Sequence, residues 1–331
     1  MQDIKNKRIL SGIQPSGELH IGNYFGAIKQ HIEFQKNNEC YYFVANLHAL
    51  TTIQDRRRLE ENTIEVAMAY IALGLDPGRA CLFAQSDIPE VTELAWILST
   101  VTPLGLLERA HSYKDKISRG ITPSHGLFAY PTLMAADILI YDSEVVPVGK
   151  DQKQHLEMTR DMAIKFNNIF GETFVIPEEY ILPEVAVVPG IDGQKMSKSY
   201  GNTIDIFSEY NTLKQKIMGI VTDSTPLEAP KNPDTNTIYQ LYRLFATPEE
   251  KDEMREKFLK GGYGYAEAKK DLLDKIYTFF HPYRERRKRL LREREYVETV
   301  LRNGAKNARA RAQHVMERVR NRCGVLKFTY Y

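Results

Sequence analysis

Residues 8–28 read RILSGIQPSGELHIGNYFGAI, and this stretch decides the fold. An apolar run at residues 8–14 ends in turn residues at 15–17, and helical spacing then extends over residues 21–36. A strand that passes through a tight turn into a helix is typical of the first half of a βαβ unit. The chain therefore begins as an α/β protein.

Strand-like and helix-like segments continue to alternate up to about residue 200. Further strands are predicted at residues 40–45, 80–84, 145–148 and 185–188. Helices are predicted at residues 57–73, 130–141 and 151–170, with two more within 90–116. This alternation indicates a doubly wound, Rossmann-like parallel sheet. Because strand-like runs then stop, we predict a sheet domain at residues 1–200 and a mainly α-helical domain at 201–331, whose last helix can pack back on the first domain.

The composition is that of an ordinary globular protein. The chain has 331 residues, 43% hydrophobic and 27% charged, which excludes disordered and fibrous proteins. No segment approaches the ~18 apolar residues of a membrane span, and the N-terminus lacks the apolar core of a signal peptide, so we expect a cytoplasmic protein with no membrane partner. The three cysteines are far apart and lack CxxC spacing, so neither a disulfide framework nor a structural metal is expected.

The charge is distributed unevenly along the chain. The net charge is only +2, but residues 281–331 carry +10 and the remainder carries −8. A basic end on an acidic body suggests a polyanionic partner such as a nucleic acid. The alternative is a solvated, salt-bridged helical face, since glutamates are mixed among the arginines.

The turn after the first strand carries a histidine and an asparagine. His20 and Asn23 are three residues apart at the start of the expected helix, so both side chains can face one ligand. In a doubly wound sheet this position faces the ligand crevice, and the N–H groups of a helix start suit phosphate. Gly17 and Gly22 allow the backbone to approach a nucleotide closely. From this turn alone, the alternative is a capped helix with a surface histidine.

A second pattern is KMSKS at residues 195–199, here called the lysine loop. It follows the last predicted strand and a glycine-containing turn. Lys195 and Lys198 are three residues apart and interleaved with hydroxyl groups, so they can hold a pyrophosphate as it gains charge. The alternative is a solvated surface loop.

The two patterns together resemble the signatures of class I aminoacyl-tRNA synthetases. Further matches, over about residues 8–325, narrow the resemblance to the bacterial tryptophanyl-tRNA synthetases. They are GIQPSG at 12–17, HIGNY at 20–24, YP at 130–131, LMAADIL at 133–139, VPVG at 146–149, DQ at 151–152 and QH at 154–155. The resemblance implies that ATP activates L-tryptophan, with Mg²⁺ sharing the pyrophosphate charge. Tryptophan then passes to the ribose at the 3′ end of tRNA(Trp).

The resemblance also implies a set of residues around ATP. Because the attacking carboxylate is already ionised, no general base is needed, and catalysis depends on positioning and on cationic and N–H donors. The implied catalytic residues are His20, Asn23, Lys195 and Lys198. The implied ATP-binding residues are Gln14, Pro15, Ser16, Gly22, Asn23, Gly149, Lys150, Asp151, Val188, Lys195, Met196, Ser197, Lys198 and Ser199. Candidates for a further phosphate contact are Lys114 and Lys116.

Asp137 is the residue expected to select tryptophan. It lies in the apolar segment MAADILI at residues 134–140. An unpaired buried carboxylate is costly, so it needs a partner, and an indole N–H is such a partner. The other implied tryptophan-binding residues are Tyr130, Met134, Val148 and Gln152. The alternative is a helix carboxylate that faces water or pairs with an arginine.

The basic C-terminal end has a matching partner in this family. We expect tRNA phosphates to meet Arg284, Arg286, Arg287, Lys288, Arg289, Arg309 and Arg311. Such contacts supply salt-dependent affinity more than sequence choice. The family also implies a homodimer. His48 and His155 are expected to be packed, hydrogen-bonded histidines, and Trp96 a core or interface residue.

Three other functions compete with this interpretation. A tyrosyl enzyme has the same fold, and an aspartate can accept a hydrogen bond from a phenol. A catalytically silent relative that senses tryptophan or RNA does not need both phosphate-binding patterns, which are intact here. A small nucleotidyltransferase that shares the histidine motif does not explain the long helical end or the lysine loop.

Overall fold

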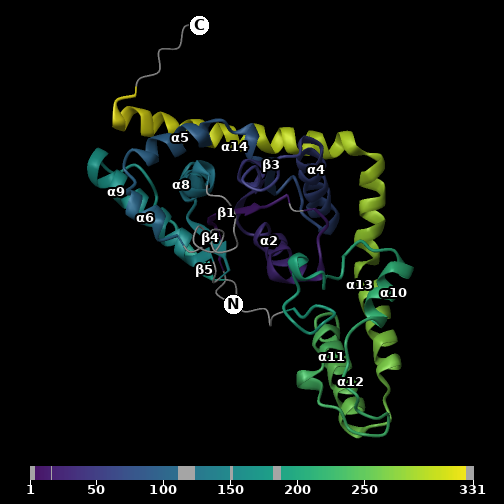
Figure 1. Cartoon of the computed structure of the whole chain (residues 1–331). Helices are drawn as coiled ribbons and strands as arrows, with labels where there is room; N and C mark the ends of the chain where they lie inside the picture. Colours follow the sequence, from purple (N-terminus) through teal and green to yellow (C-terminus); the bar gives the residue numbers. More distant parts are fainter. Residues whose placement is uncertain (1–3, 16, 111–123, 150–151, 182–187, 326–331) are drawn as a thin grey trace.

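The computed structural model describes residues 4–15, 17–110, 124–149, 152–181 and 188–325. A sheet with helices on both faces forms one part of the molecule (Figure 1). Two long helices complete it: one runs down toward a small helical group, and the last crosses back over the sheet.

Five parallel strands form the sheet. They are β1 (Arg8–Ile13), β2 (Glu39–Val44), β3 (Ala80–Ala84), β4 (Val145–Val148) and β5 (Glu178–Ile181). Their order is β3-β2-β1-β4-β5, and every neighbouring pair is parallel, which confirms the doubly wound α/β prediction. The order reverses at β1, so the carboxyl ends of β1 and β4 flank the ligand crevice that such sheets provide.

The first four predicted strands agree with β1 to β4. Of the segment predicted at 185–188, only Val188 lies within the described residues. Within the described residues the fifth strand is β5, which the sequence did not indicate. It is an edge strand of sequence EEYI with no buried residue, so it lacks the apolar run by which the other strands were recognised.

Helices of the sheet-bearing part cover both faces. They are α1 (Ile21–Asn23), α2 (Lys29–Phe34), α3 (Asn46–Ala49), α4 (Arg56–Leu73), α5 (Glu90–Ser99), α6 (Leu104–Glu108), α8 (His125–Leu139) and α9 (Lys153–Phe170). A π-helical turn at Tyr24–Ile28 joins α1 to α2, so the helix predicted at 21–36 is not a continuous α-helix. Helix α8 starts earlier than predicted, because the Ser124 side chain caps it by accepting a hydrogen bond from the N–H of Leu127.

Described elements beyond residue 200 are helical. They are α10 (Tyr210–Met218), α11 (Thr237–Tyr242), α12 (Pro248–Lys260), α13 (Tyr265–Arg292) and α14 (Arg294–Cys323), with short 3₁₀ turns. Alternate residues along β2 point into two separate cores. Tyr42 and Val44 join the core that continues into α13, whereas Tyr41 and Phe43 join the core under α5, α8, α9 and α14.

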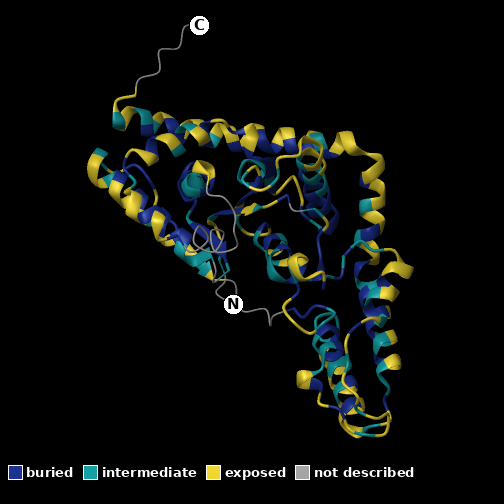
Figure 2. Cartoon of the chain, viewed as in Figure 1, coloured by how far each residue is buried: buried dark blue, intermediate teal, exposed yellow. Residues whose placement is uncertain are grey.

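The last helix, α14, packs on the sheet-bearing part and presents its exposed side outward (Figure 2). A Cβ on Gly304 would lie only 2.0 Å from the carbonyl oxygen of Leu82 in β3, so only glycine allows this approach. Arginines of α14 also pair with Glu90, Glu93 and Asp142. The long helix is therefore fixed against the sheet by packing and by charge. The domain boundary near residue 200 stays a prediction.

Candidate active site

A cavity of about 560 Å³ opens at the carboxyl ends of β1 and β4, and we call it the central cavity. This is the place where a doubly wound sheet binds its ligand. The lining contains all five residues predicted to bind tryptophan and three of those predicted to bind ATP. They are Tyr130, Met134, Asp137, Val148 and Gln152, with Gln14, Asn23 and Gly149. Four separate segments of the chain thus contribute to one site.

Asp137 provides a buried carboxylate at this cavity. Helix α8 carries it, and the residue is only 2% exposed. Its Oδ2 is hydrogen-bonded to Nε2 of His48 at 2.8 Å. Both carboxylate oxygens accept from Nε2 of Gln85, at 2.9 and 2.8 Å. Burial raises the pKa of Asp137, and the contacts with His48 and Gln85 act against that shift.

These contacts correct the argument that led to Asp137. The indole N–H was predicted as the partner of the buried carboxylate, with water or an arginine as the alternative. The structure instead supplies His48 and Gln85, neither of which was predicted at the site. Gln85 directly follows β3, and His48 follows β2 closely, so their place after the carboxyl end of a strand was the available signal. The role of Asp137 in selecting tryptophan stays a prediction.

Both histidines expected to be packed are hydrogen-bonded. His155 is buried, and its Nε2 is hydrogen-bonded to the hydroxyl of Tyr130. The pairing of His48 with Asp137 also confirms the expectation, but the His48 ring lines the central cavity as well. His48 is therefore placed to affect ligand binding.

His20 and Asn23 are joined at the start of α1. His20 precedes the helix and is 8% exposed. Its backbone N–H donates to Oδ1 of Asn23 at 3.0 Å. Burial, together with the positive charge of Lys198, lowers the pKa of His20 to about 4. His20 is therefore neutral at pH 7, and it can meet a phosphate through a hydrogen bond but not as a cation.

The segment after the lysine loop pairs with the segment around His20. The N–H of Ile21 donates to the carbonyl of Ile204 at 3.0 Å, and the N–H of Ile206 donates to the carbonyl of Leu19 at 3.1 Å. These bonds join the histidine motif to the segment after the lysine loop, although the two are far apart in sequence. The structure therefore brings the histidine motif and the lysine loop side by side, as a shared nucleotide site requires.

Residues of the lysine loop face different surroundings. Met196 is buried, and its Cβ would lie 3.5 Å from a Cβ on Gly22. Lys195 and Lys198 are exposed. The described lining of the central cavity does not include residues 195–199, so their contact with ATP stays a prediction.

The remaining ATP-binding predictions have different outcomes. Val188 is buried, and its carbonyl accepts from the N–H of Met196. The carbonyl of Pro15 accepts from Nδ2 of Asn62 at 3.0 Å. These backbone bonds organise the site but do not test the predicted nucleotide contacts. Outside the described residues lie Ser16, Lys114, Lys116, Lys150 and Asp151.

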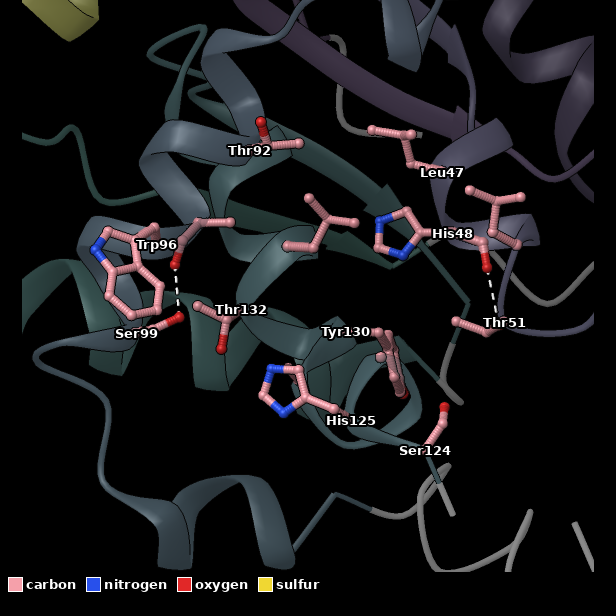
Figure 3. A pocket seen from close by; sticks show the side chains of 15 residues that line it. Leu47, His48, Thr51, Thr92, Trp96, Ser99, Ser124, His125, Tyr130 and Thr132 are labelled. Carbon is pink, nitrogen blue, oxygen red and sulfur yellow. Dashed lines mark hydrogen bonds between the residues drawn. The ribbon is translucent and has the colours of Figure 1, made fainter. Parts of the chain in front are cut away.

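Trp96 lines a separate surface groove of about 380 Å³ (Figure 3). It is 73% exposed, so the expectation of a core residue is wrong, while that of an interface residue stays a prediction. In Figure 3 Trp96 and His48 lie on opposite sides of the groove, and Tyr130 lies below His48. His48 and Tyr130 also line the central cavity, so the two hollows share a wall.

Most of the basic residues expected at tRNA phosphates are engaged within the chain. Arg287 pairs with Glu65 at 2.6 Å, Arg309 with Glu90 at 2.9 Å and Arg311 with Asp142 at 2.6 Å, while buried Arg284 lies over the ring of Tyr277. These contacts stabilise the packing of α13 and α14. Buried Arg284 is therefore wrong as a phosphate contact, whereas contact of Arg287, Arg309 and Arg311 with tRNA stays a prediction. Lys288 is exposed but pairs with Glu209 and Glu285. Arg286 and Arg289 are exposed.

Comparison with known families identifies this arrangement. Residues 3–281 match the family of tRNA synthetases class I (W and Y). The chain belongs to this family. The resemblance found in the sequence is thus confirmed, and the chain is a class I aminoacyl-tRNA synthetase of the bacterial tryptophanyl type.

Relatives in this synthetase family match over nearly their whole length. A tryptophan–tRNA ligase of Fusobacterium nucleatum is 54% identical, over 98% of this chain and 100% of its own. One from Rhodopirellula baltica is 53% identical, over 96% of this chain and 99% of its own. A crystal structure of the Campylobacter jejuni tryptophanyl-tRNA synthetase, complexed with ADP and tryptophan, is 50% identical. It has a TM-score of 0.92 and covers 96% of this chain and 99% of its own.

The described residues also show neither a membrane-spanning helix nor a metal-binding cluster. No described helix combines the length and the apolar character that a membrane crossing requires. Among the same residues, no group of three or more His, Cys, Asp or Glu side chains is arranged to hold a metal ion.

Proposed function

We propose that this synthetase activates L-tryptophan with ATP and transfers it to the 3′ end of tRNA(Trp). The observation that carries the proposal is the central cavity, which gathers the predicted tryptophan residues and part of the ATP set where β1 and β4 end. The histidine motif is bonded to the segment that follows the lysine loop, and Met196 of the loop lies beside Gly22. The names of relatives with 50–54% identity over nearly the whole chain support the choice of amino acid.

In the first step, a carboxylate oxygen of tryptophan attacks the α-phosphorus of ATP. The new oxygen–phosphorus bond forms as the bond to the β-phosphate oxygen breaks, and pyrophosphate leaves with that electron pair. Lys195 and Lys198 neutralise the charge that develops on the pyrophosphate. Neutral His20 and the side-chain amide of Asn23 donate hydrogen bonds to the triphosphate. The chain's contribution is therefore positioning and charge, without a general base.

Mg²⁺ fits this site as an ion carried by the triphosphate. The described residues offer no cluster of protein ligands that could hold it alone. Mg²⁺ characteristically keeps several waters and binds through substrate phosphates. It supplies charge neutralisation on the leaving pyrophosphate, while Lys195 and Lys198 hold the same phosphates.

Asp137 selects tryptophan, the amino-acid substrate of the first step. Because His48 and Gln85 hold the carboxylate in place, it presents a fixed acceptor to an indole N–H. The carboxylate already has protein partners, so selection depends on the additional hydrogen bond from the indole N–H, which a side chain without a donor cannot make. Tyr130, Met134 and Val148 form the apolar wall, and Gln152 binds the α-amino group.

In the second step, the ribose 2′-hydroxyl oxygen at the tRNA 3′ end forms an ester bond to the carbonyl carbon of tryptophanyl-adenylate and loses its proton. The bond from that carbon to the phosphate oxygen breaks, and AMP leaves with the electron pair. Exposed Arg286 and Arg289 are the members of the basic set that we assign to tRNA phosphates. We also assign a homodimer, as the family implies. The cytoplasm is the proposed location, because charged tRNA is used there in translation.

ATP–pyrophosphate exchange with tryptophan, tyrosine and phenylalanine supplied separately tests the proposal. We expect exchange with tryptophan alone. Exchange with tyrosine would keep the chemistry and contradict the role of Asp137. Tryptophan binding without any exchange would contradict the enzymatic function and favour a sensor. Charging of tRNA(Trp) transcripts then tests the second step.

A further inference from the structure

The chain enters the lysine loop through a tight hairpin. The N–H of Met196 donates to the carbonyl of Val188 at 2.9 Å, and the N–H of Gly190 donates to the carbonyl of Gln194 at 2.7 Å. At the tip, Gly193 has a φ of +79°, a conformation that other residues rarely adopt. The hairpin sets the path of the chain up to Met196 but does not reach the second lysine.

A single buried side chain connects the hairpin to the rest of the loop. Asn202 is 2% exposed, and its Oδ1 accepts from the N–H of Ser197 at 2.8 Å. Its Nδ2 donates to the carbonyl of Lys195 at 3.1 Å and to Oδ1 of Asp192 at 2.8 Å. The amide therefore bonds to the backbone on both sides of Met196, and at the same time to the hairpin.

The fit of Asn202 against the hairpin leaves no spare room. A Cβ on Gly190 would lie 2.3 Å from Cγ and 2.4 Å from Nδ2 of Asn202. The backbone carbonyl of Asn202 also accepts from the N–H of Ile191 at 3.0 Å. Asparagine suits this place because its amide supplies an acceptor and two donors together. Aspartate lacks the donors, and alanine lacks both.

We propose that Asn202 is a positioning residue for tryptophan activation. By fixing the backbone at Lys195 and Ser197, it sets the directions in which Lys195 and Lys198 leave the loop. The inference rests on the proposed function, because it takes these lysines as the groups that hold the pyrophosphate. Asn202 itself is buried beneath the loop, so it acts through the lysines without touching the substrate.

Steady-state ATP–pyrophosphate exchange by Asn202→Ala tests the proposal. We expect kcat to fall by between about tenfold and a hundredfold and KM for ATP to rise, since small misplacements of catalytic groups have effects of this size. Tryptophan affinity, measured by calorimetry without ATP, should stay unchanged. If Asn202→Ala does not fold, Asn202→Asp keeps the acceptor for Ser197 and loses the donors, and it should show the same loss of kcat. Exchange within twofold of the parent in a folded variant would overturn the proposal.

Asn167→Ala is the matched control. Asn167 also uses both ends of its amide to hold a loop: Oδ1 accepts from the N–H groups of Thr173 and Phe174, and Nδ2 donates to the carbonyl of Phe174. It does not line the central cavity. We expect Asn167→Ala to lose thermal stability while keeping its kcat. An equal loss of kcat in both variants would show that Asn202 is only structural.

A double-mutant cycle separates this inference from the proposed function. If Asn202 acts through the lysines, Asn202→Ala should reduce exchange by a clearly smaller factor when Lys195→Ala is already present than it does in the parent, because the two changes share the effect on Lys195. Fully additive losses would overturn the positioning role. Normal exchange by both Lys195→Ala and Lys198→Ala would instead overturn the proposed function of the loop.

Discussion

The amino-acid end of the central cavity and the lysine loop hold their charged groups in opposite ways. Asp137 is buried, and its carboxylate is already bonded to His48 and Gln85. Lys195 and Lys198 are exposed on a loop whose backbone is tied down. At the amino-acid end the charged carboxylate itself is held in place. In the lysine loop only the backbone is held, and the charged side chains extend from it.

This difference matches the two tasks of the proposed reaction. Choosing an amino acid requires a rigid, desolvated acceptor that makes a wrong side chain costly. Holding pyrophosphate requires cations that reach a group whose charge grows during the step. Selectivity should therefore depend on the buried network around Asp137, and rate on the exposed lysines. The predictions below test that division.

The largest effect is expected from Lys195→Ala. Loss of one cation that stabilises the leaving pyrophosphate should reduce kcat of ATP–pyrophosphate exchange by about a hundredfold. Tryptophan binding measured by calorimetry should not change. Lys214→Ala is the control, because this lysine is exposed on α10 and lies outside the loop. A similar loss in the control would show that general surface charge is responsible.

A smaller effect is expected from Asp137→Asn. The amide is a poorer acceptor and turns a donor toward His48 or Gln85, so kcat/KM for tryptophan should fall by between about tenfold and a hundredfold. KM for ATP should stay near the parent value. Asp161→Asn removes an exposed carboxylate from α9 and should leave both constants unchanged. An unaltered kcat/KM for tryptophan in Asp137→Asn would contradict the role of Asp137 in selecting tryptophan.

Gln85→Met should show an effect of the same kind but smaller. Gln85 is 1% exposed, and its Oε1 also accepts from the N–H groups of Leu47 and His48. Methionine has a similar shape but cannot hold the Asp137 carboxylate, so kcat/KM for tryptophan should fall by about tenfold. The free energy of unfolding should fall by about 1–3 kcal/mol, measured by urea denaturation. A change in KM for ATP alone would contradict the link to Asp137.

The last prediction concerns stability alone, with no change in activity at pH 7, and it involves His31. Burial lowers the pKa of this histidine from 6.5 to about 4. As the pH falls through 6.5, the unfolded chain takes up a proton that the folded chain does not, so stability falls until about pH 4. Between pH 7 and 5 the parent should lose about 2 kcal/mol more than His31→Gln. Parallel stability curves for the two proteins would contradict a neutral buried His31.

The sequence indicated β1 to β4 because each is an apolar run that ends in turn residues. It did not indicate β5, since Glu178–Ile181 is an exposed edge strand held by pairing with β4. Site residues that belong to recognisable motifs, such as His20 and Lys195, could likewise be predicted from the spacing of the motif. His48, Gln85 and Asn202 were not predicted as site residues, because their roles depend on which loops meet in space. The ion pairs of Arg309 and Arg311 were not predicted for the same reason, since their carboxylate partners are distant in sequence.

The most direct test compares Lys195→Ala and Asp137→Asn in one set of exchange assays, with ATP and tryptophan titrated in turn. We expect Lys195→Ala to lose kcat while tryptophan affinity is kept. We expect Asp137→Asn to lose kcat/KM for tryptophan while KM for ATP is kept. If both variants lost the same constant by the same factor, the two ends of the site would not divide selectivity and rate.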